Sequence, residues 1–160
     1  MRNRLPISLI VVFAVSVLLW AAGDPLNGTW KTNVAKSKYS PGPPPGGFSI
    51  LKFEISGDEE KYDSQQFDGQ GKITGHVQYI AKYDGKDYPQ ERLAGNSTVD
   101  TVVIKRIDAY TSERVEKSGG KVVSTLRRVV SKDGKSFTTT RKGTNAQGQP
   151  VNNVVVYEKQ

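Results

Sequence analysis

Histidine and cysteine, which build most metal sites and many nucleophilic sites, are almost absent from this sequence. Cysteine does not occur, and His76 is the only histidine among the 160 residues. Disulfides, thiolate ligands and a thiol nucleophile are therefore excluded, and a zinc site or a Ser-His-Asp triad has a single position to build on. The alternation in residues 73–83 places His76 opposite Tyr79 and Tyr83, so we expect it to face solvent. We predict no metal ion and no cofactor.

The acidic residues suggest no catalytic or calcium-binding arrangement. Asp58, Glu59, Glu60 and Asp63 could offer oxygen atoms to calcium, but the ordered ligand spacing of a calcium loop is missing. We interpret this group as a solvated hairpin turn. Glycoside hydrolysis needs two carboxylates that folding brings together, and the 16 acidic residues single out no such pair. No glycine-rich phosphate loop and no nucleophile elbow occur.

One arginine stands out because of the strand face on which it falls. Alternation in residues 136–142 places Phe137, Thr139 and Arg141 on one face, which we expect to be buried. Arginine is rarely buried unless it is paired, so an inward Arg141 needs an acid, backbone carbonyls, water or an anionic ligand. The alternatives are a position near a barrel mouth or stacking on Trp30. The residues we predict to contact a ligand are Tyr79, Tyr83, Phe137 and Arg141.

The elements that would position these residues are short strands joined by tight turns. Glycine recurs at intervals in turn sequences such as Asp68-Gly69, Asp84-Gly85 and Asp133-Gly134, and the segments between are rich in Val, Ile, Thr, Tyr and Phe. We predict an all-β fold, an antiparallel up-and-down meander closed into a barrel of about eight to ten strands. A two-sheet β-sandwich is the alternative. We expect a turn or two of helix in residues 33–39, and a stiff connector across one end of the fold in residues 41–47, rich in proline and glycine.

The first two dozen residues have the three parts of a secretory signal peptide. Arg2 and Arg4 precede an apolar run over residues 5–20, and small residues follow. The small-residue rule favours cleavage before Asp24, so we predict a signal peptide in residues 1–23 and one barrel domain in residues 24–160. We expect a secreted or periplasmic protein with no membrane span after cleavage. The alternative is a retained anchor helix.

The charge balance gives little indication of a macromolecular partner. The net charge of +7 is modest, and acidic residues interrupt the basic ones along the chain. No basic stripe stands out, so we predict no nucleic-acid partner. The sequence indicates no oligomeric state.

Gly28-Thr29-Trp30 resembles the Gly-x-Trp signature of the lipocalin and fatty-acid-binding (calycin) superfamily. The predicted domain also looks like a group of uncharacterised secreted bacterial lipocalin-like proteins over nearly its whole length. The segments that carry this resemblance are residues 28–33, 35–38, 83–89 and 151–153. The resemblance implies a barrel in which Trp30 closes one end beneath an arginine from a late strand, and the candidates are Arg127, Arg128 and Arg141. The final strand contains no arginine, and there is no room for the long C-terminal helix of typical lipocalins.

Three functions remain open. The first is a secreted, non-catalytic barrel that holds a small, partly apolar ligand. This ligand would be hydrophobic or amphipathic, and one form of the hypothesis gives it a negative charge. The second is an interaction or structural barrel of the cell envelope with a filled interior, and the third is a lipocalin-fold enzyme. The interior volume separates the first two, because small barrels are filled by side chains whereas larger ones leave a cavity. The enzyme hypothesis would be favoured if two carboxylates converged in the cavity, or if Tyr83 and Arg141 did.

Overall fold

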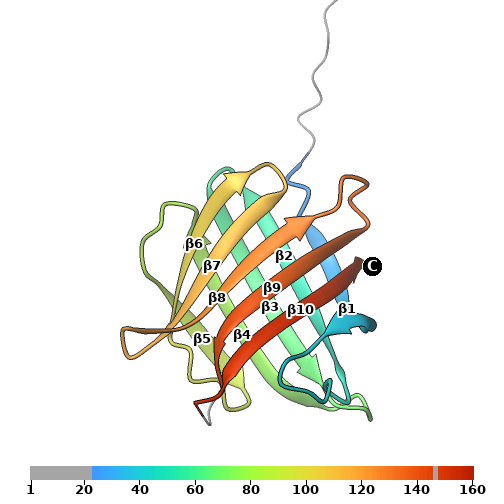
Figure 1. Ribbon diagram of the computed structural model, residues 1–160. Helices are drawn as coiled ribbons and strands as arrows, with labels where there is room; N and C mark the ends of the chain where they lie inside the picture. Colours follow the sequence, from blue (N-terminus) through green and yellow to red (C-terminus); the bar gives the residue numbers. More distant parts are fainter. Residues whose placement is uncertain (1–22, 146–147) are drawn as a thin grey trace, which may run out of the picture.

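Ten antiparallel strands form a closed barrel in the computed structural model, which describes residues 23–145 and 148–160 (Figure 1). The predicted signal peptide lies outside the described residues except for Gly23. The strands are β1 (Gly28–Lys38), β2 (Phe48–Ser56), β3 (Glu59–Phe67), β4 (Ile73–Lys82), β5 (Tyr88–Ala94), β6 (Thr101–Asp108), β7 (Thr111–Ser118), β8 (Lys121–Val130), β9 (Ser136–Thr144) and β10 (Pro150–Lys159).

Each strand pairs with its neighbours in the chain, and β1 pairs with β10 to close the barrel. The predicted up-and-down barrel is confirmed, and the two-sheet sandwich is not formed. Glycine makes the tight turns possible: Gly57 between β2 and β3 and Gly134 between β8 and β9 have φ angles of 60° and 66°, which side chains with a Cβ rarely adopt. The described part of the chain contains no helix of the length and hydropathy needed to cross a bilayer.

The helix expected in residues 33–39 is wrong, because β1 runs on to Lys38. One side chain, that of Ser37, bridges an irregular stretch of the strand. The hydroxyl of Ser37 donates to the carbonyl of Asn33 at 2.7 Å and accepts the backbone N–H of Val156 at 2.9 Å. Pairing then resumes between Lys38 and Val154. Hydrogen bonds to β10, which the local sequence does not reveal, outweigh the weak helical tendency.

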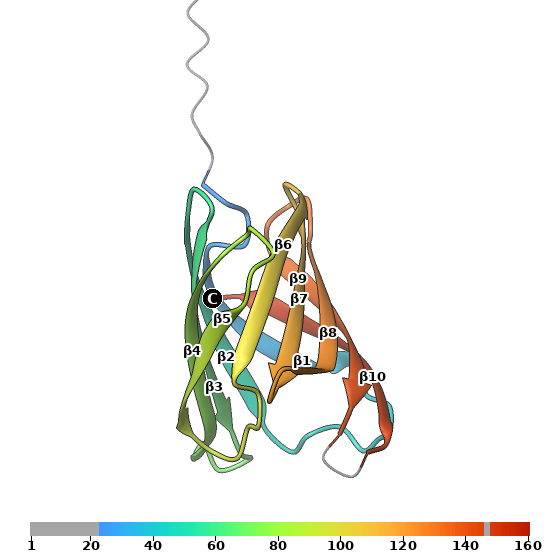
Figure 2. The same ribbon diagram turned by 90° about the vertical axis from the view of Figure 1, so that its left-hand side faces the viewer.

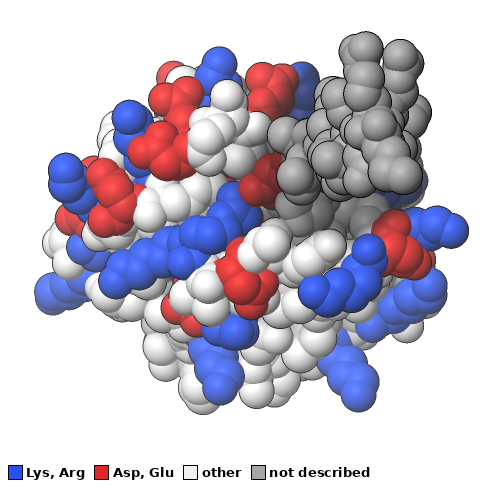
Figure 3. All heavy atoms as spheres, turned by 90° about the horizontal axis from the view of Figure 1, so that it is seen from above, with Lys and Arg blue, Asp and Glu red and all other residues white. Residues whose placement is uncertain are grey.

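The barrel has one closed end and one open end. At the closed end, large side chains fill the interior: Leu26, Trp30, Phe53 and Phe137 are almost fully buried. Seen from that end, basic and acidic side chains are interspersed over the surface (Figure 3). At the other end, residues 39–47 connect β1 to β2 and cross beneath the strands, as the predicted connector should (Figure 2).

Trp30 is buried, as predicted, with none of its surface exposed. Its indole Nε1 donates to the carbonyl of Leu26 at 2.8 Å, so the polar edge of the ring is satisfied. The cation over the ring is Lys159 of the final strand, with Nζ 5.1 Å from the ring centroid, rather than an arginine. Each of the three candidate arginines is instead paired with a glutamate; the pairs are Arg127–Glu113, Arg128–Glu60 and Arg141–Glu116.

Candidate functional site

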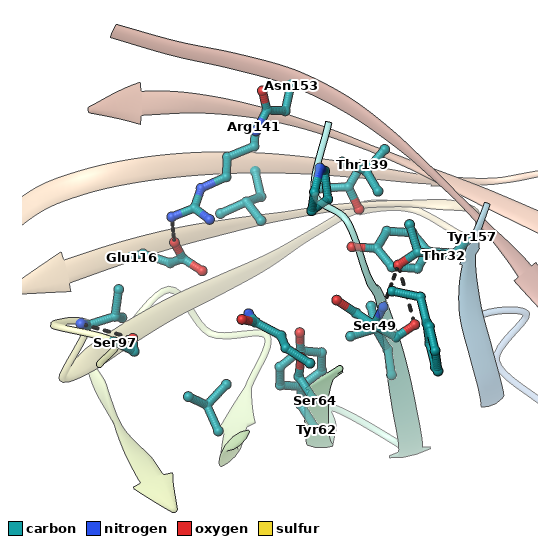
Figure 4. A pocket seen from close by; sticks show the side chains of 18 of the residues that line it. Thr32, Ser49, Tyr62, Ser64, Ser97, Glu116, Thr139, Arg141, Asn153 and Tyr157 are labelled. Atoms are coloured by element: carbon teal, nitrogen blue, oxygen red, sulfur yellow. Dashed lines mark hydrogen bonds and ion pairs between the residues drawn. The ribbon is translucent and has the colours of Figure 1, made fainter. Parts of the chain in front are cut away.

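An internal cavity of about 370 Å³ occupies the open half of the barrel (Figure 4). Its wall combines side chains from nearly every strand with residues of the β1–β2 connection. Three of the described lining residues carry charge at neutral pH: Arg114 and Glu116 on β7, and Arg141 on β9. The rest of the wall is divided between hydroxyl or amide groups and apolar or aromatic side chains.

Glu116 is the centre of the charged group. Its Oε1 accepts a hydrogen bond from Arg114 Nη2 at 2.6 Å, and its Oε2 accepts one from Arg141 Nη2 at 2.9 Å. The hydroxyl of Ser124 also donates to Oε2. Arg114 is nine-tenths buried, and its Nε has no hydrogen-bond partner among the described residues. Arg141 is 42% exposed and approaches Glu116 from the next-but-one strand.

These contacts keep Glu116 ionised. Burial by itself raises the pKa of its carboxyl group, but the charges of Arg114 and Arg141 and the hydroxyl of Ser124 outweigh burial, so the pKa falls below its ordinary value. Arginine stays protonated at all physiological pH. Two cations therefore face one anion, and among the described lining residues one positive charge is uncompensated.

Hydroxyl groups line other parts of the cavity wall, with Tyr62 and Ser64 on β3 and Thr139 on β9 (Figure 4). Tyr62, Ser64 and Thr139 are each more than nine-tenths buried, yet their hydroxyls make no hydrogen bond to any described residue. Thr32 is different, because its hydroxyl accepts from the backbone N–H of Ser49 at 3.1 Å. The cavity thus presents several hydrogen-bonding groups that the protein itself leaves unused.

The β1–β2 connection forms one side of the cavity mouth, and Tyr39, Pro45 and Gly47 line the cavity. One end of the connection is fixed where Ser40 accepts the backbone N–H of Asn152 at 2.8 Å. The other end is fixed where Gly47 lies so close to β3 that an added Cβ would stand 1.8 Å from the carbonyl oxygen of Phe67. The connection is therefore held at both ends.

A second charged group lies deeper and is sealed from the cavity. Glu60 has no exposed surface, and Arg128 binds it through both guanidinium nitrogens, at 2.9 and 3.1 Å. Burial raises the pKa of Glu60, but Arg128 and the hydroxyls of Tyr79 and Tyr83 outweigh burial and lower it. The interpretation of Glu60 as part of a solvated turn is wrong. The turn ends before Glu59, and alternation along β3 carries Glu60 to the inner face with Tyr62.

The structure separates the four residues predicted to contact a ligand. Arg141 lines the cavity, and Phe137 and Thr139 share its face of β9 as predicted. Tyr79 and Tyr83 instead donate hydrogen bonds to Glu60, and Phe137 packs among the aromatic rings of the closed end. His76 lies on the outer face, where its Nε2 is 2.6 Å from Asp63 Oδ2.

Sequence reasoning missed Arg114 and Glu116. Alternation on β7 places Ser112, Arg114 and Glu116 on one face and leaves Val115, the strand's only valine, on the other. Such a pattern is typical of a strand whose polar face is solvated, yet here the polar face is buried. The available indication was on β8, where Ser124 and Arg128 lie opposite Glu116 and Ser112 once the register is known.

The chain thus folds as a closed ten-stranded up-and-down barrel with an internal cavity. The fold is similar to that of zebrafish ileal bile acid-binding protein in a crystal structure with cholic acid, with a TM-score of 0.52 and 13% sequence identity. The match covers 85% of this chain and 99% of the zebrafish chain. No protein-family model matches the sequence, and no curated protein matches it significantly.

Proposed function

We propose that this protein is a non-catalytic binding barrel for a small amphipathic molecule that carries one negative charge. The observation that carries the proposal is the uncompensated positive charge of the group formed by Arg114, Glu116 and Arg141 inside the cavity. A carboxylate placed there would meet guanidinium donors in a partly dry site, where charge-assisted hydrogen bonds are about twice as strong as neutral ones. The bile-acid-binding neighbour was crystallised with such an amphipathic acid, and this supports the same class of ligand here.

The cavity argues against the two alternatives. A structural barrel with a filled interior needs side chains in both halves, whereas this barrel is filled only at the closed end. An enzyme would be favoured by two carboxylates in the cavity, but Glu116 is the single carboxylate among the described lining residues. Tyr83, the other candidate beside Arg141, lies at Glu60 instead.

The test compares carboxylic acids with their methyl esters by isothermal titration calorimetry. Arg141→Gln should weaken binding of an acid about tenfold more than binding of its ester, because only the acid uses the guanidinium charge. The matched control is Arg127→Gln, since Arg127 lies on the outer face of β8 and pairs with the half-exposed Glu113. Equal losses for acid and ester would remove Arg141 from the site, and failure of every acid to bind would overturn the proposed function.

We also propose that the barrel acts outside the cytoplasm. Support comes from the basic, apolar and small-residue regions in residues 1–23. N-terminal sequencing of the protein isolated from its host should begin at Asp24. A product that begins at Met1, or that stays in the membrane, would contradict this proposal.

A further inference from the structure

We infer that the ligand is a compact, hydroxylated monocarboxylate of about a dozen non-hydrogen atoms, rather than a long-chain fatty acid or a bile acid. This inference rests on the proposed function and concerns the same cavity. Three independent features of the cavity carry it: its volume, the hydroxyl groups that the protein leaves unpaired, and the balance of its charges.

The volume limits the size of the ligand. About 370 Å³ is near the lower end of the about 300 to 1,000 Å³ typical of ligand sites, and it would hold about a dozen water molecules. The cavity cannot extend inward, because Phe137 and the sealed pair of Glu60 and Arg128 occupy the closed half. A longer ligand could extend inward only by separating that pair, which would leave a charge buried without a partner and is strongly unfavourable. If it extended outward, the extra length would pass the mouth into water and gain no burial.

The unpaired hydroxyl groups determine what the body of the ligand must offer. Tyr62, Ser64 and Thr139 are buried, face the cavity and make no hydrogen bond to any described residue. An alkyl chain would displace water from these groups and leave them unsatisfied, at a cost in affinity. Hydroxyl groups on a ligand would replace the water and its hydrogen bonds. Aromatic side chains in the same wall, including Tyr62 and Tyr157, offer flat apolar area for a ring.

The charge balance sets the number of acidic groups and their position. One excess positive charge is neutralised by one carboxylate, and a second carboxylate would be repelled by Glu116. The guanidinium of Arg141 is partly exposed beside Glu116 and is the donor that a carboxylate would reach, whereas the Nε of Arg114 is itself buried without a partner among the described residues. Arg141 lies on β9 and Glu116 on β7, so the carboxylate faces these strands. Hydroxyl groups on the body of the ligand would then reach Tyr62 and Ser64 on β3 and also Thr139, which lies on β9 two residues before Arg141.

The experiment uses four probes in calorimetry on residues 24–160: 3,4-dihydroxycinnamate, its methyl ester, undecanoate with the same number of non-hydrogen atoms, and cholate. We expect 3,4-dihydroxycinnamate to bind at least about tenfold more tightly than the other three. Thr139→Val should weaken its binding about tenfold and leave undecanoate unchanged, because only the first probe uses the hydroxyl. Thr140→Val is the matched control, since Thr140 follows on the same strand but faces away from the cavity.

The outcomes separate this inference from the proposed function. Undecanoate or cholate binding as tightly as the hydroxylated acid would overturn the ligand class, while the binding function would stand. Equal effects of Thr139→Val on 3,4-dihydroxycinnamate and undecanoate would also overturn it, because the hydroxyl would then act only through the fold. If none of the acids binds, both the inference and the proposed function fail.

Discussion

The ring of Phe137 meets the ring of Trp30 edge-on, with the centroids 5.0 Å apart and the planes at 87°. On its other side, Phe137 stacks on Tyr157, which lines the cavity, with centroids 4.5 Å apart. Phe137 therefore separates the filled half of the barrel from the open half. Its effect on a ligand would pass through Tyr157.

We predict that Trp30→Ala lowers the free energy of unfolding by about 3–5 kcal/mol, because it removes a fully buried indole from the closed end. Trp30→Phe should cost less, since it keeps a ring against Phe137 and loses the hydrogen bond to Leu26. Denaturant unfolding monitored by circular dichroism measures both. A loss under about 1 kcal/mol for Trp30→Ala would show that the closed end does not depend on this ring.

Gly47→Ala should destabilise the protein by at least about 1–3 kcal/mol, because the new Cβ would collide with the backbone of Phe67. It should also weaken ligand binding, since Gly47 lines the cavity mouth. Gly46→Ala is the control, because a Cβ at that exposed position meets nothing within 4 Å, and its effect should stay within about 0.5 kcal/mol. Thermal melts and calorimetry on both variants provide the comparison, and equal stability of the two would contradict the close approach to β3.

Arg128→Met should cost about 3–5 kcal/mol of stability, because it leaves the carboxylate of Glu60 buried without its partner. Its neighbour supplies the control: Arg127→Met removes a half-exposed ion pair with Glu113 and should cost less than about 1 kcal/mol. Denaturant midpoints would measure the difference. Similar losses of stability in the two variants would show that the buried charge of Glu60 does not depend on Arg128.

Stability should fall as the pH drops below about 4.3, the ordinary pKa of glutamate. The pKa values of Glu60 and Glu116 are lowered in the folded protein, so the unfolded chain takes up protons first. The two carboxylates contribute fully to the free energy of unfolding at a pH above the pKa of glutamate in the unfolded chain. This contribution is lost as the pH falls through their lower pKa values in the folded protein. Scanning calorimetry between about pH 7 and pH 3 should show a steeper decline for the parent protein than for Glu116→Gln. A melting temperature that is constant over this pH interval would contradict the lowered pKa values of Glu60 and Glu116.

The sequence by itself determined the all-β class and the up-and-down order of the strands. Hydrophobic alternation and glycine turns depend on residues that are close along the chain, and these patterns correctly place Phe137, Thr139 and Arg141 on one inner face. The burial of Trp30 also follows from nearby residues, because a large aromatic side chain beside Gly28 at the start of the first strand is suited to closing the end of a barrel. The limit of local reasoning is visible in β1, where pairing with β10 replaced the expected helix in residues 33–39.

Only the tertiary structure decided what the barrel contains. Glu60 and Arg128 are 68 residues apart, and Glu116 and Arg141 are 25 apart, so no local pattern indicates that these charges are buried together. Polar alternation on β7 is typical of a solvated face, yet this face is buried, and its charges are compensated in part by Arg141 from a distant segment of the chain. The cavity volume likewise depends on how side chains from opposite strands fill the interior. The burial of these charge pairs and the volume of the cavity both depend on contacts between residues that are distant in the sequence. Those contacts exist only after the barrel has closed.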